Sequence, residues 1–254
     1  MDVILAKIIK YLNGCMYYDM TYIILKWMLD HYIEMDEDSF SMENLMKDTG
    51  ASEEDVHKVL RGLEESEDFE AFKKRLWQYQ SIRLDQIRAR MIGLSLEDIM
   101  QDMEKNETDA EMRVKIEAIC DCLDRSKRIF LVGAVYPMAI ATEFQTDLNI
   151  FGKDVQQYHA FDKTLKLDEN DMLILISATG RSAEYFIKNK KEINPSAAKS
   201  LIITQNRKYD EDEFRVSDFT IILPGRFDGI NGNYQVMKIF DLLRLSYYQR
   251  YYLG

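Results

Sequence analysis

The sequence has little proline, cysteine or histidine. The small numbers of cysteine and histidine argue against a disulfide-rich protein and against a zinc site. Three prolines occur in 254 residues, and none precedes residue 137. Three cysteines in a chain of this length do not make a disulfide framework and are typical of reduced thiols in a cytoplasm. Cys120 and Cys122 have no matching Cys or His pair nearby, so they lack the ligand spacing of a zinc site. We therefore expect a cytoplasmic protein with no metal and no other cofactor.

Long apolar runs and a basic, cleavable N-terminal segment are also absent. No window approaches the run of about 18 apolar residues that a membrane span needs. We expect neither a membrane span nor secretion. The hydrophobic fraction of 46% is enough to build real cores. The net charge of −11 disfavours non-specific affinity for nucleic acid but leaves room for a local basic patch.

The first ninety residues contain helical patterns. Residues 20–35 have apolar side chains close to helical spacing, and a shorter helix is expected to begin near Ser41 and to end at Gly50. A second helix is expected from Ser52 to Glu65, with Asp55 placed to close a capping box. A short helix, a tight turn with glycine and a second helix predict a helix-turn-helix.

The remainder alternates β-rich runs with helical patterns, which predicts a parallel sheet covered by helices on both faces. The polar break at 106–109 helps to place the change of character. We predict an α + α/β chain, with an all-helical domain over 1–92, a linker over 93–107 and a three-layer α/β/α domain over 108–254. Its five parallel strands are expected at 128–133, 154–159, 171–177, 200–204 and 219–223.

The last helical pattern, residues 233–253, carries many leucines and tyrosines. They exceed what one helix face needs, and exposed apolar patches of that kind mark interfaces. We therefore expect a homodimer or a dimer of dimers. The residues that carry this expectation are Leu242, Leu243, Leu245, Tyr247, Tyr248, Tyr251 and Tyr252.

A cluster of small hydroxylated residues follows the third strand run in "ILISATGRSAEYF", residues 174–186. Ligands of open parallel sheets bind beyond the carboxyl ends of the strands. Ser177, Thr179 and Ser182 offer hydroxyls, Gly180 permits close backbone approach, and the helix that starts near Ser182 adds amide donors. These features suit a phosphate, although a plain helix cap within a serine-rich turn has the same composition. Neither a Walker loop nor a dinucleotide fingerprint is present.

The longer stretch "DMLILISATGRSAEYF" resembles the signature of the SIS (sugar isomerase) domain, in which a strand leads into Ser-x-Ser/Thr-Gly-x-Ser/Thr and then a glutamate. Together with the helix-turn-helix pattern, residues 16–252 resemble the RpiR family of bacterial transcriptional regulators. The resemblance implies a C-terminal domain that senses phosphorylated sugars and an N-terminal domain that binds operator DNA as a dimer. The ligand-binding residues that it implies are Gly133, Ser177, Thr179, Gly180, Arg181, Ser182, Glu184 and Thr204.

The sequence departs from that family pattern in both expected domains. The first SIS loop usually reads Gly-x-Gly-x-Ser, whereas here Gly133 is followed by Ala-Val-Tyr-Pro, and Pro137 has no amide hydrogen. In the expected DNA-reading helix, Lys58 and Arg61, with His57, are the candidate DNA contacts. Five acids accompany them, and residues 1–92 hold 12 basic and 18 acidic residues, a net charge of −6.

Three functions remain open from the sequence. The leading one is a transcriptional regulator that responds to a phosphorylated sugar and is not an enzyme. A sugar-phosphate isomerase is the second, with Glu184 as general base and His159 as acid. The third is a module that retains the sugar-phosphate fold and has lost DNA binding, which the acidic helix favours.

Overall fold

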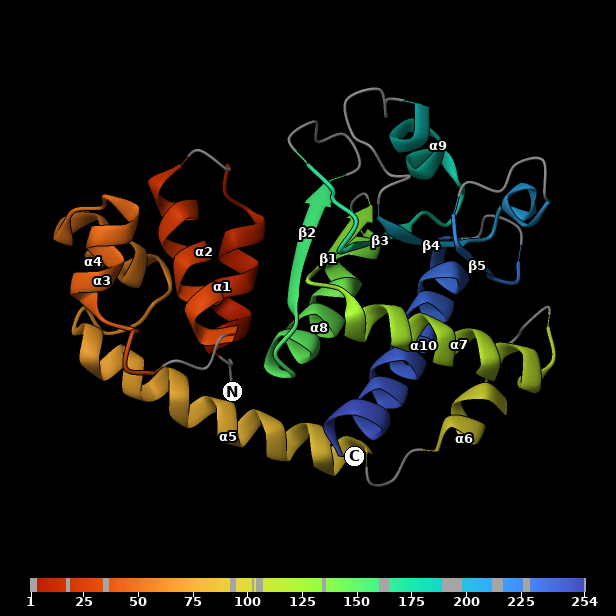
Figure 1. Cartoon of the computed structure of the whole chain (residues 1–254), viewed down its shortest axis with the longest axis horizontal. Coiled ribbons are helices and arrows are strands. Elements are labelled where there is room, and N and C mark those ends of the chain that lie inside the picture. Colours follow the sequence, from red (N-terminus) through yellow and green to blue (C-terminus); the bar gives the residue numbers. More distant parts are fainter. Residues whose placement is uncertain are drawn as a thin grey trace. The chain divides into compact units, whose positions relative to one another are not determined.

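The structure of the chain is a computed structural model (Figure 1). It divides into two compact units, Met1–Ile92 and Gly93–Gly254. Segment 93–107, the expected linker, contains helix α6 (Leu96–Gln101) and belongs to the second unit. The structure describes residues 4–16, 19–33, 37–91, 95–101, 103, 107–133, 136–159, 165–188, 198–211, 217–225 and 229–253.

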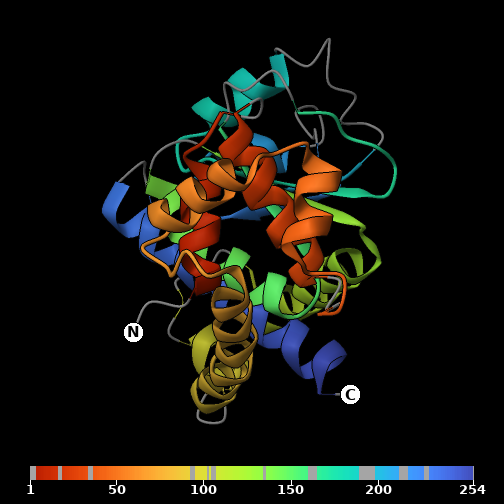
Figure 2. The same ribbon diagram turned by 90° about the vertical axis from the view of Figure 1, so that its left-hand side faces the viewer.

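The described part of the first unit is helical. Helices α1 and α2 lie side by side (Figure 2). Phe40 lies at the centre of an aromatic core, because its ring centroid is 5.4 Å from that of Phe69, 4.9 Å from that of Trp77 and 5.4 Å from that of Trp27. The helices are α1 (Ile4–Asn13), α2 (Met20–Ile33), α3 (Met42–Thr49), α4 (Glu53–Gly62) and α5 (Phe69–Met91).

The two short helices α3 and α4 begin and end for local chemical reasons. The Ser41 hydroxyl accepts the amide of Asn44 at 3.2 Å and caps α3, and Gly50 ends that helix with a left-handed φ of 71°. Ser52 and Asp55 form a reciprocal capping box at the start of α4. The predicted short helices and their caps are therefore confirmed.

The predicted end of the second short helix, Glu65, is wrong. Helix α4 stops at Gly62, and Glu64 then takes a left-handed φ of 57°. That turn carries Glu65 into the interior, where 1% of its side chain is exposed. Its carboxylate lies 3.1 Å from Lys7 Nζ and 2.7 Å from Arg75 Nη1. Glu65 is thus a buried ion-pair partner and not a surface acid of α4.

The second unit contains the predicted five-stranded parallel sheet. Its strand order is β2-β1-β3-β4-β5, and every neighbouring pair is parallel. The strand positions and the fold class are confirmed. The strands are β1 (Arg128–Gly133), β2 (Asp154–His159), β3 (Asp171–Ile176), β4 (Lys199–Thr204) and β5 (Phe219–Ile222).

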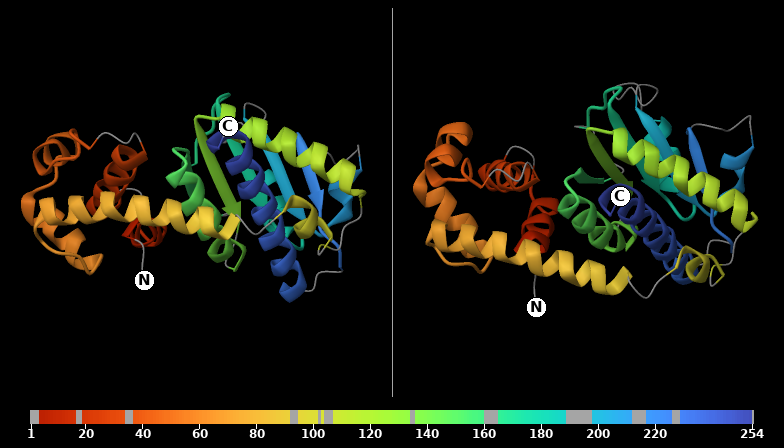
Figure 3. Two further views of the ribbon diagram at one scale, coloured as in Figure 1. Left: turned by 90° about the horizontal axis from the view of Figure 1, so that it is seen from below. Right: turned by 60° about the horizontal axis from the view of Figure 1, so that its bottom comes forward.

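Helices cover both faces of this sheet. Alternate residues of the central strands, such as Phe130 and Leu175, pack on one face against Ala183 and Phe186 of α9 (Arg181–Lys188) and against Tyr209. On the other face, α10 packs against α7 and α8 (Figure 3). The bounds of these three helices are Asp109–Arg125 for α7, Tyr136–Ile150 for α8 and Gly229–Tyr247 for α10. None of the described helices has the length and apolar composition that a bilayer crossing requires.

Asp171 of the SIS-like stretch holds the amino edge of the sheet. Its carboxylate accepts hydrogen bonds from Arg128 Nε at 2.8 Å, from Arg128 Nη2 at 2.6 Å and from the amide of Asp168 at 2.7 Å. These bonds join the starts of β1 and β3. Asp171 therefore lies at the opposite end of β3 from the serine-rich turn and has a structural role in the sheet.

The C-terminal tyrosines and leucines do not form an exposed patch, so the argument for a dimer that rested on them is wrong. Tyr247 donates to a carboxylate oxygen of Asp124 at 3.1 Å. Phe151 stacks on Tyr247 and makes tilted ring contacts with Tyr248 and Tyr252. The three leucines of this stretch, Leu242, Leu243 and Leu245, are buried within the same unit. Most of this apolar surface is therefore packed within the second unit, whereas Tyr251 and Tyr252 are partly exposed.

Candidate functional site

The candidate site lies at the carboxyl ends of β1 and β3. In the order β2-β1-β3-β4-β5 the chain winds outward in two directions from these two strands, which makes their carboxyl ends the topological switch point. Gly133 pairs in register with Ile176, so the ends of the two strands are level. The turn from β3 to α9, residues 177–180, follows directly. The structure therefore brings Gly133 and the serine-rich turn to the place where open parallel sheets bind ligands.

The turn is closed by hydrogen bonds of its own backbone and of Ser177. The Gly180 amide donates to the Ser177 carbonyl at 2.9 Å, and the Ser177 amide donates to the Ile203 carbonyl of β4 at 3.0 Å. The Ser177 hydroxyl accepts the amide of Ala183 at 3.2 Å and so caps the first turn of α9. Ser177 is only 5% exposed. The Ser177 hydroxyl oxygen therefore helps to order the turn. The hydroxyl hydrogen is still able to donate to a ligand.

The more accessible groups of the turn are Thr179, Arg181 and Ser182. Thr179 and Ser182 are half-buried, and Arg181 is exposed. The first amides of α9 have no acceptor within the helix, because the helix begins there. Those of Arg181 and Ala183 donate instead to the hydroxyls of Thr179, at 3.4 Å, and Ser177. Hydroxyls, amide donors and the positive end of a helix dipole gathered in one turn suit an anion such as phosphate.

The segment after β4 forms a brace for the β3–α9 turn, because two of its side chains donate hydrogen bonds to carbonyls of that turn. Asn206 donates from Nδ2 to the Thr179 carbonyl at 3.4 Å, and Tyr209 donates from its hydroxyl to the Gly180 carbonyl at 3.3 Å. Thr204 is fully buried, and its hydroxyl donates to the Ala178 carbonyl at 3.3 Å. Thr204 thus supports the turn from inside the protein. Sequence reasoning missed Asn206 and Tyr209, because only the pairing of β3 with β4 brings them here.

Gly180 is required at its position for two reasons. Its φ is 80°, in the left-handed region that side chains disfavour. A Cβ atom there would also lie 2.7 Å from Asn206 Nδ2 and 3.1 Å from Tyr209 Cε2. Asn206 and Tyr209 are therefore able to pack this closely against the turn only because residue 180 has no side chain.

Glu184, in the first turn of α9, lies between two lysines. Its Oε1 is 2.7 Å from Lys188 Nζ, and its Oε2 is 3.4 Å from Lys208 Nζ. The hydrogen bond from Lys188, the Lys188 charge and then the contact with Lys208 hold the pKa of the Glu184 carboxyl below its usual range. A carboxylate stabilised in this way is a weaker base, which argues against Glu184 as the general base of an isomerase.

The other side of the site begins at Gly133. A Cβ atom on Gly133 would lie 2.7 Å from Met138 Sδ and 2.9 Å from the Ile176 carbonyl, so the strand end is tightly packed. Residues 134 and 135 lie outside the described residues, as does the side chain of Tyr136. Pro137 lies in the first turn of α8, where the missing amide hydrogen removes one of the donors that a helix start offers. His159 ends β2 and pairs in register with Gly133.

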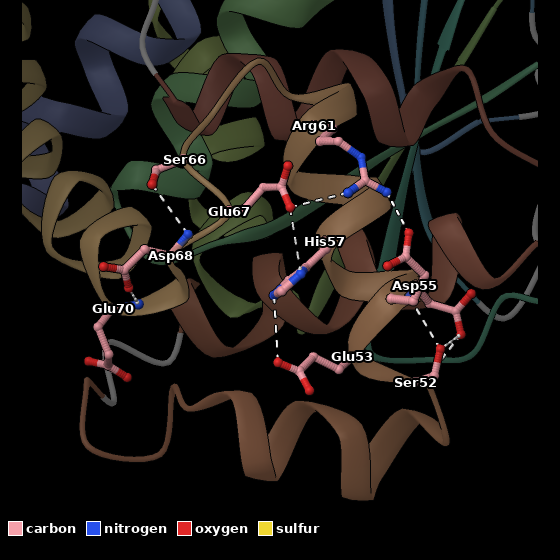
Figure 4. A network of polar contacts seen from close by, with 10 residues as sticks. Ser52, Glu53, Asp55, His57, Arg61, Ser66, Glu67, Asp68 and Glu70 are labelled. Atoms are coloured by element: carbon pink, nitrogen blue, oxygen red, sulfur yellow. Dashed lines mark hydrogen bonds and ion pairs between the residues drawn. The ribbon is translucent and has the colours of Figure 1, made fainter.

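Two of the three candidate DNA contacts on α4, His57 and Arg61, lie among acidic side chains (Figure 4). Arg61 lies 2.6 Å from a carboxylate oxygen of Glu54 and 3.2 Å from one of Glu67. His57 lies between Glu53 at 3.9 Å and Glu67 at 3.7 Å. Glu67 reaches α4 because the chain turns back after that helix. Exposed pairs like these stabilise little, so they hold Arg61 and His57 only weakly.

Lys58 is exposed on the same helix. It contributes to lowering the pKa of Asp55, behind the hydrogen bonds from Ser52 that are the larger causes. Within the described part of the chain, His57 and Arg61 form ion pairs with glutamates, whereas Lys58 forms none. Helix α4 carries three acidic side chains in its first turn and only two basic ones, Lys58 and Arg61, so its exposed face is not positively charged.

The described residues provide no obvious metal site. They contain no group of three or more His, Cys, Asp or Glu side chains placed to hold a metal ion. Burial raises the pKa of the Cys120 thiol to about 12, so this cysteine of α7 stays protonated and unreactive. A groove of about 770 Å³ lies elsewhere in the second unit, between α7 and β5, and no residue of the β3–α9 turn lines it.

Comparison with known proteins gives distant structural resemblances only. No family model matches the sequence, and no curated protein matches it. NanR of Vibrio vulnificus complexed with ManNAc-6P is 13% identical, with 98% of this chain and 93% of that chain covered and a TM-score of 0.47. The sugar isomerase domain of an RpiR transcription factor from Sphaerobacter thermophilus is 16% identical, with 65% and 89% covered and a TM-score of 0.44.

A third neighbour is the hypothetical protein MJ1247 from Methanococcus jannaschii, for which a 3-hexulose-6-phosphate isomerase function has been inferred. It is 22% identical, with 63% of this chain and 90% of that chain covered and a TM-score of 0.47. At these identities and TM-scores the resemblances carry no functional argument. The fold stands on the strand order and register of this chain itself.

Proposed function

We propose that the second unit binds a phosphorylated sugar at the β3–α9 turn and that the chain is a transcriptional regulator that responds to this ligand. The observation that carries the proposal is the turn itself. Ser177, Thr179 and Ser182 surround the start of α9 at the switch point of the sheet, and Asn206 and Tyr209 hold the turn in shape. A preorganised turn of this kind loses little conformational freedom when an anion binds.

Calorimetry with a panel of sugar phosphates tests the ligand. ManNAc-6P, the ligand in the Vibrio NanR complex, belongs in the panel, with each free sugar as its control. We expect Ser177→Ala together with Ser182→Ala to weaken binding strongly, because hydrogen bonds to charged groups contribute about 1.5–3 kcal/mol each. Since the Ser177 hydroxyl also caps α9, Ser182→Ala alone is the variant that separates lost contacts from a loosened turn. If no sugar phosphate raises the melting temperature at millimolar concentration, the sensing role fails.

The same proposal includes DNA binding by the first unit as a homodimer. Regulators of the helix-turn-helix class read two half-sites with two subunits. Lys58, Arg61 and His57 are the proposed DNA contacts. The pairing of Arg61 and His57 with glutamates favours a second candidate, a module that binds the sugar phosphate but not DNA.

We further propose that the chain is not an isomerase, and we expect no turnover of aldose or ketose phosphates. Isomerisation needs a general base near the sugar carbon, and the lysines beside Glu184 oppose that role. An assay of the pure protein with the same panel tests this. Conversion that Glu184→Gln abolishes would contradict the proposal and support the enzyme.

A further inference from the structure

A charged cluster lies beside the proposed phosphate site and is not needed to form the turn. It consists of Glu184, Lys188 and Lys208. Lys188 is one helical turn from Glu184 on α9, whereas Lys208 comes from the short 3-10 helix Arg207–Asp210 after β4. Two chain segments 24 residues apart thus meet in one contact, Lys208 Nζ to Glu184 Oε2 at 3.4 Å.

Lys208 is positioned by the same residues that brace the turn. Its amide donates to Asn206 Oδ1 at 3.2 Å, and its ammonium lies 5.0 Å from the centroid of the Tyr209 ring. Asn206 and Tyr209 in turn donate to the carbonyls of Thr179 and Gly180. The side chain of Lys208 is 34% exposed, so solvent reaches part of it next to the turn. It is therefore within reach of an anion bound at the start of α9.

We propose that Lys208 is a phosphate-binding residue and that Glu184 is an internal counter-anion, which holds Lys208 when no ligand is bound and which the ligand phosphate displaces. This inference rests on the proposed function of the β3–α9 turn. It reverses the role of Glu184 that the family resemblance implies, because a carboxylate repels a phosphate. Glu184 then lowers the affinity for every phosphate ester and sets the ligand concentration at which the protein responds.

The charges around the turn support this arrangement. A phosphate monoester brings close to two negative charges to a helix start where Glu184 already places one. The lowered pKa of Glu184 keeps that carboxylate ionised. Exposed ion pairs are weak, so a phosphate that carries more charge and three acceptor oxygens competes well for Lys208.

The test is calorimetric titration of the full chain with inorganic phosphate and with the sugar phosphate that binds best. We expect Glu184→Gln to tighten binding roughly three- to tenfold and Lys208→Met to weaken it by a similar factor. In the double variant, the gain from Glu184→Gln is expected to shrink, because the lysine that it releases is gone. Glu169→Gln and Lys127→Met are the matched controls, since they make the same charge changes at exposed positions near the amino edge of the sheet.

The outcomes separate this inference from the function on which it rests. If wild type binds a sugar phosphate and Glu184→Gln changes the affinity no more than Glu169→Gln does, Glu184 is not a counter-anion, although the site stands. If Glu184→Gln binds phosphate where wild type does not, both ideas are supported. If no variant binds any phosphate, both the site and the counter-anion are wrong.

Discussion

Replacing Gly180 with alanine is expected to abolish measurable sugar-phosphate binding and to destabilise the second unit. The φ of 80° alone costs a side-chain-bearing residue about 1–2 kcal/mol. The new Cβ would lie 2.7 Å from Asn206 Nδ2 and 3.0 Å from Asn206 Cβ, so the brace must move. Because Asn206 and Tyr209 hold the carbonyls of Thr179 and Gly180, that movement opens the turn. We expect a total loss of roughly 2–4 kcal/mol in the free energy of unfolding.

Gly152→Ala is the control for this experiment. Gly152 has a similar φ of 85°, but a Cβ atom there meets no heavy atom within 4 Å. It therefore carries the backbone cost without the steric one. Chemical denaturation of both variants, together with calorimetry, checks the expectation. Equal destabilisation of the two variants with sugar-phosphate binding retained in Gly180→Ala would show that the brace does not shape the site.

The second large effect is expected on DNA binding when the acids of α4 are reversed. Glu53→Lys with Glu54→Lys removes two negative charges and adds two positive ones, a change of +4 in net charge per subunit, and frees Arg61 from its 2.6 Å contact with Glu54. Each additional phosphate contact steepens the dependence of log K on log salt by about 0.9. With one to three new contacts, we expect non-specific affinity to rise at least roughly tenfold at low salt. Gel shifts over a range of salt concentrations measure both quantities.

A matched variant shows whether α4 itself faces the DNA. Glu37→Lys with Glu43→Lys makes the same change of charge at exposed positions before and within α3. If that variant gains as much affinity as the α4 variant, general electrostatics explains the gain and α4 is not the DNA surface. Lys58→Ala with Arg61→Ala is expected to remove whatever specific binding wild type has. If the wild-type protein shifts no DNA fragment at low salt, the better interpretation is a module that binds the sugar phosphate but not DNA.

The sheet was predictable because its signals are local. Runs such as Leu173–Ile176 are aliphatic on both faces, as strands between two helical layers must be, and small polar residues mark their ends. The helix caps at Ser41 and Ser52 depend on residues three positions away, so they too were visible in the sequence. Local signals therefore gave the architecture and the position of the turn.

The features that the sequence could not show depend on distant pairings. Asn206 and Tyr209 reach the turn only because β4 lies beside β3. Glu65 is buried because the chain reverses at Glu64, a non-glycine residue in a left-handed conformation that no pattern announces. The C-terminal tyrosines have the composition of an interface, and only their packing on Phe151 and their hydrogen bonds to α7 show that they face inward.

Backbone amide chemical shifts, followed while a sugar phosphate is titrated into the isotope-labelled protein, test the central claim most directly. They report which residues the ligand touches and do not depend on any variant folding. We expect the largest changes at the amides of Thr179, Arg181 and Ser182, with smaller ones at Gly133 and Lys208. The free sugar at the same concentration should leave these amides unmoved. Changes concentrated in the groove between α7 and β5, or no change at millimolar ligand, would contradict a phosphate site at the β3–α9 turn.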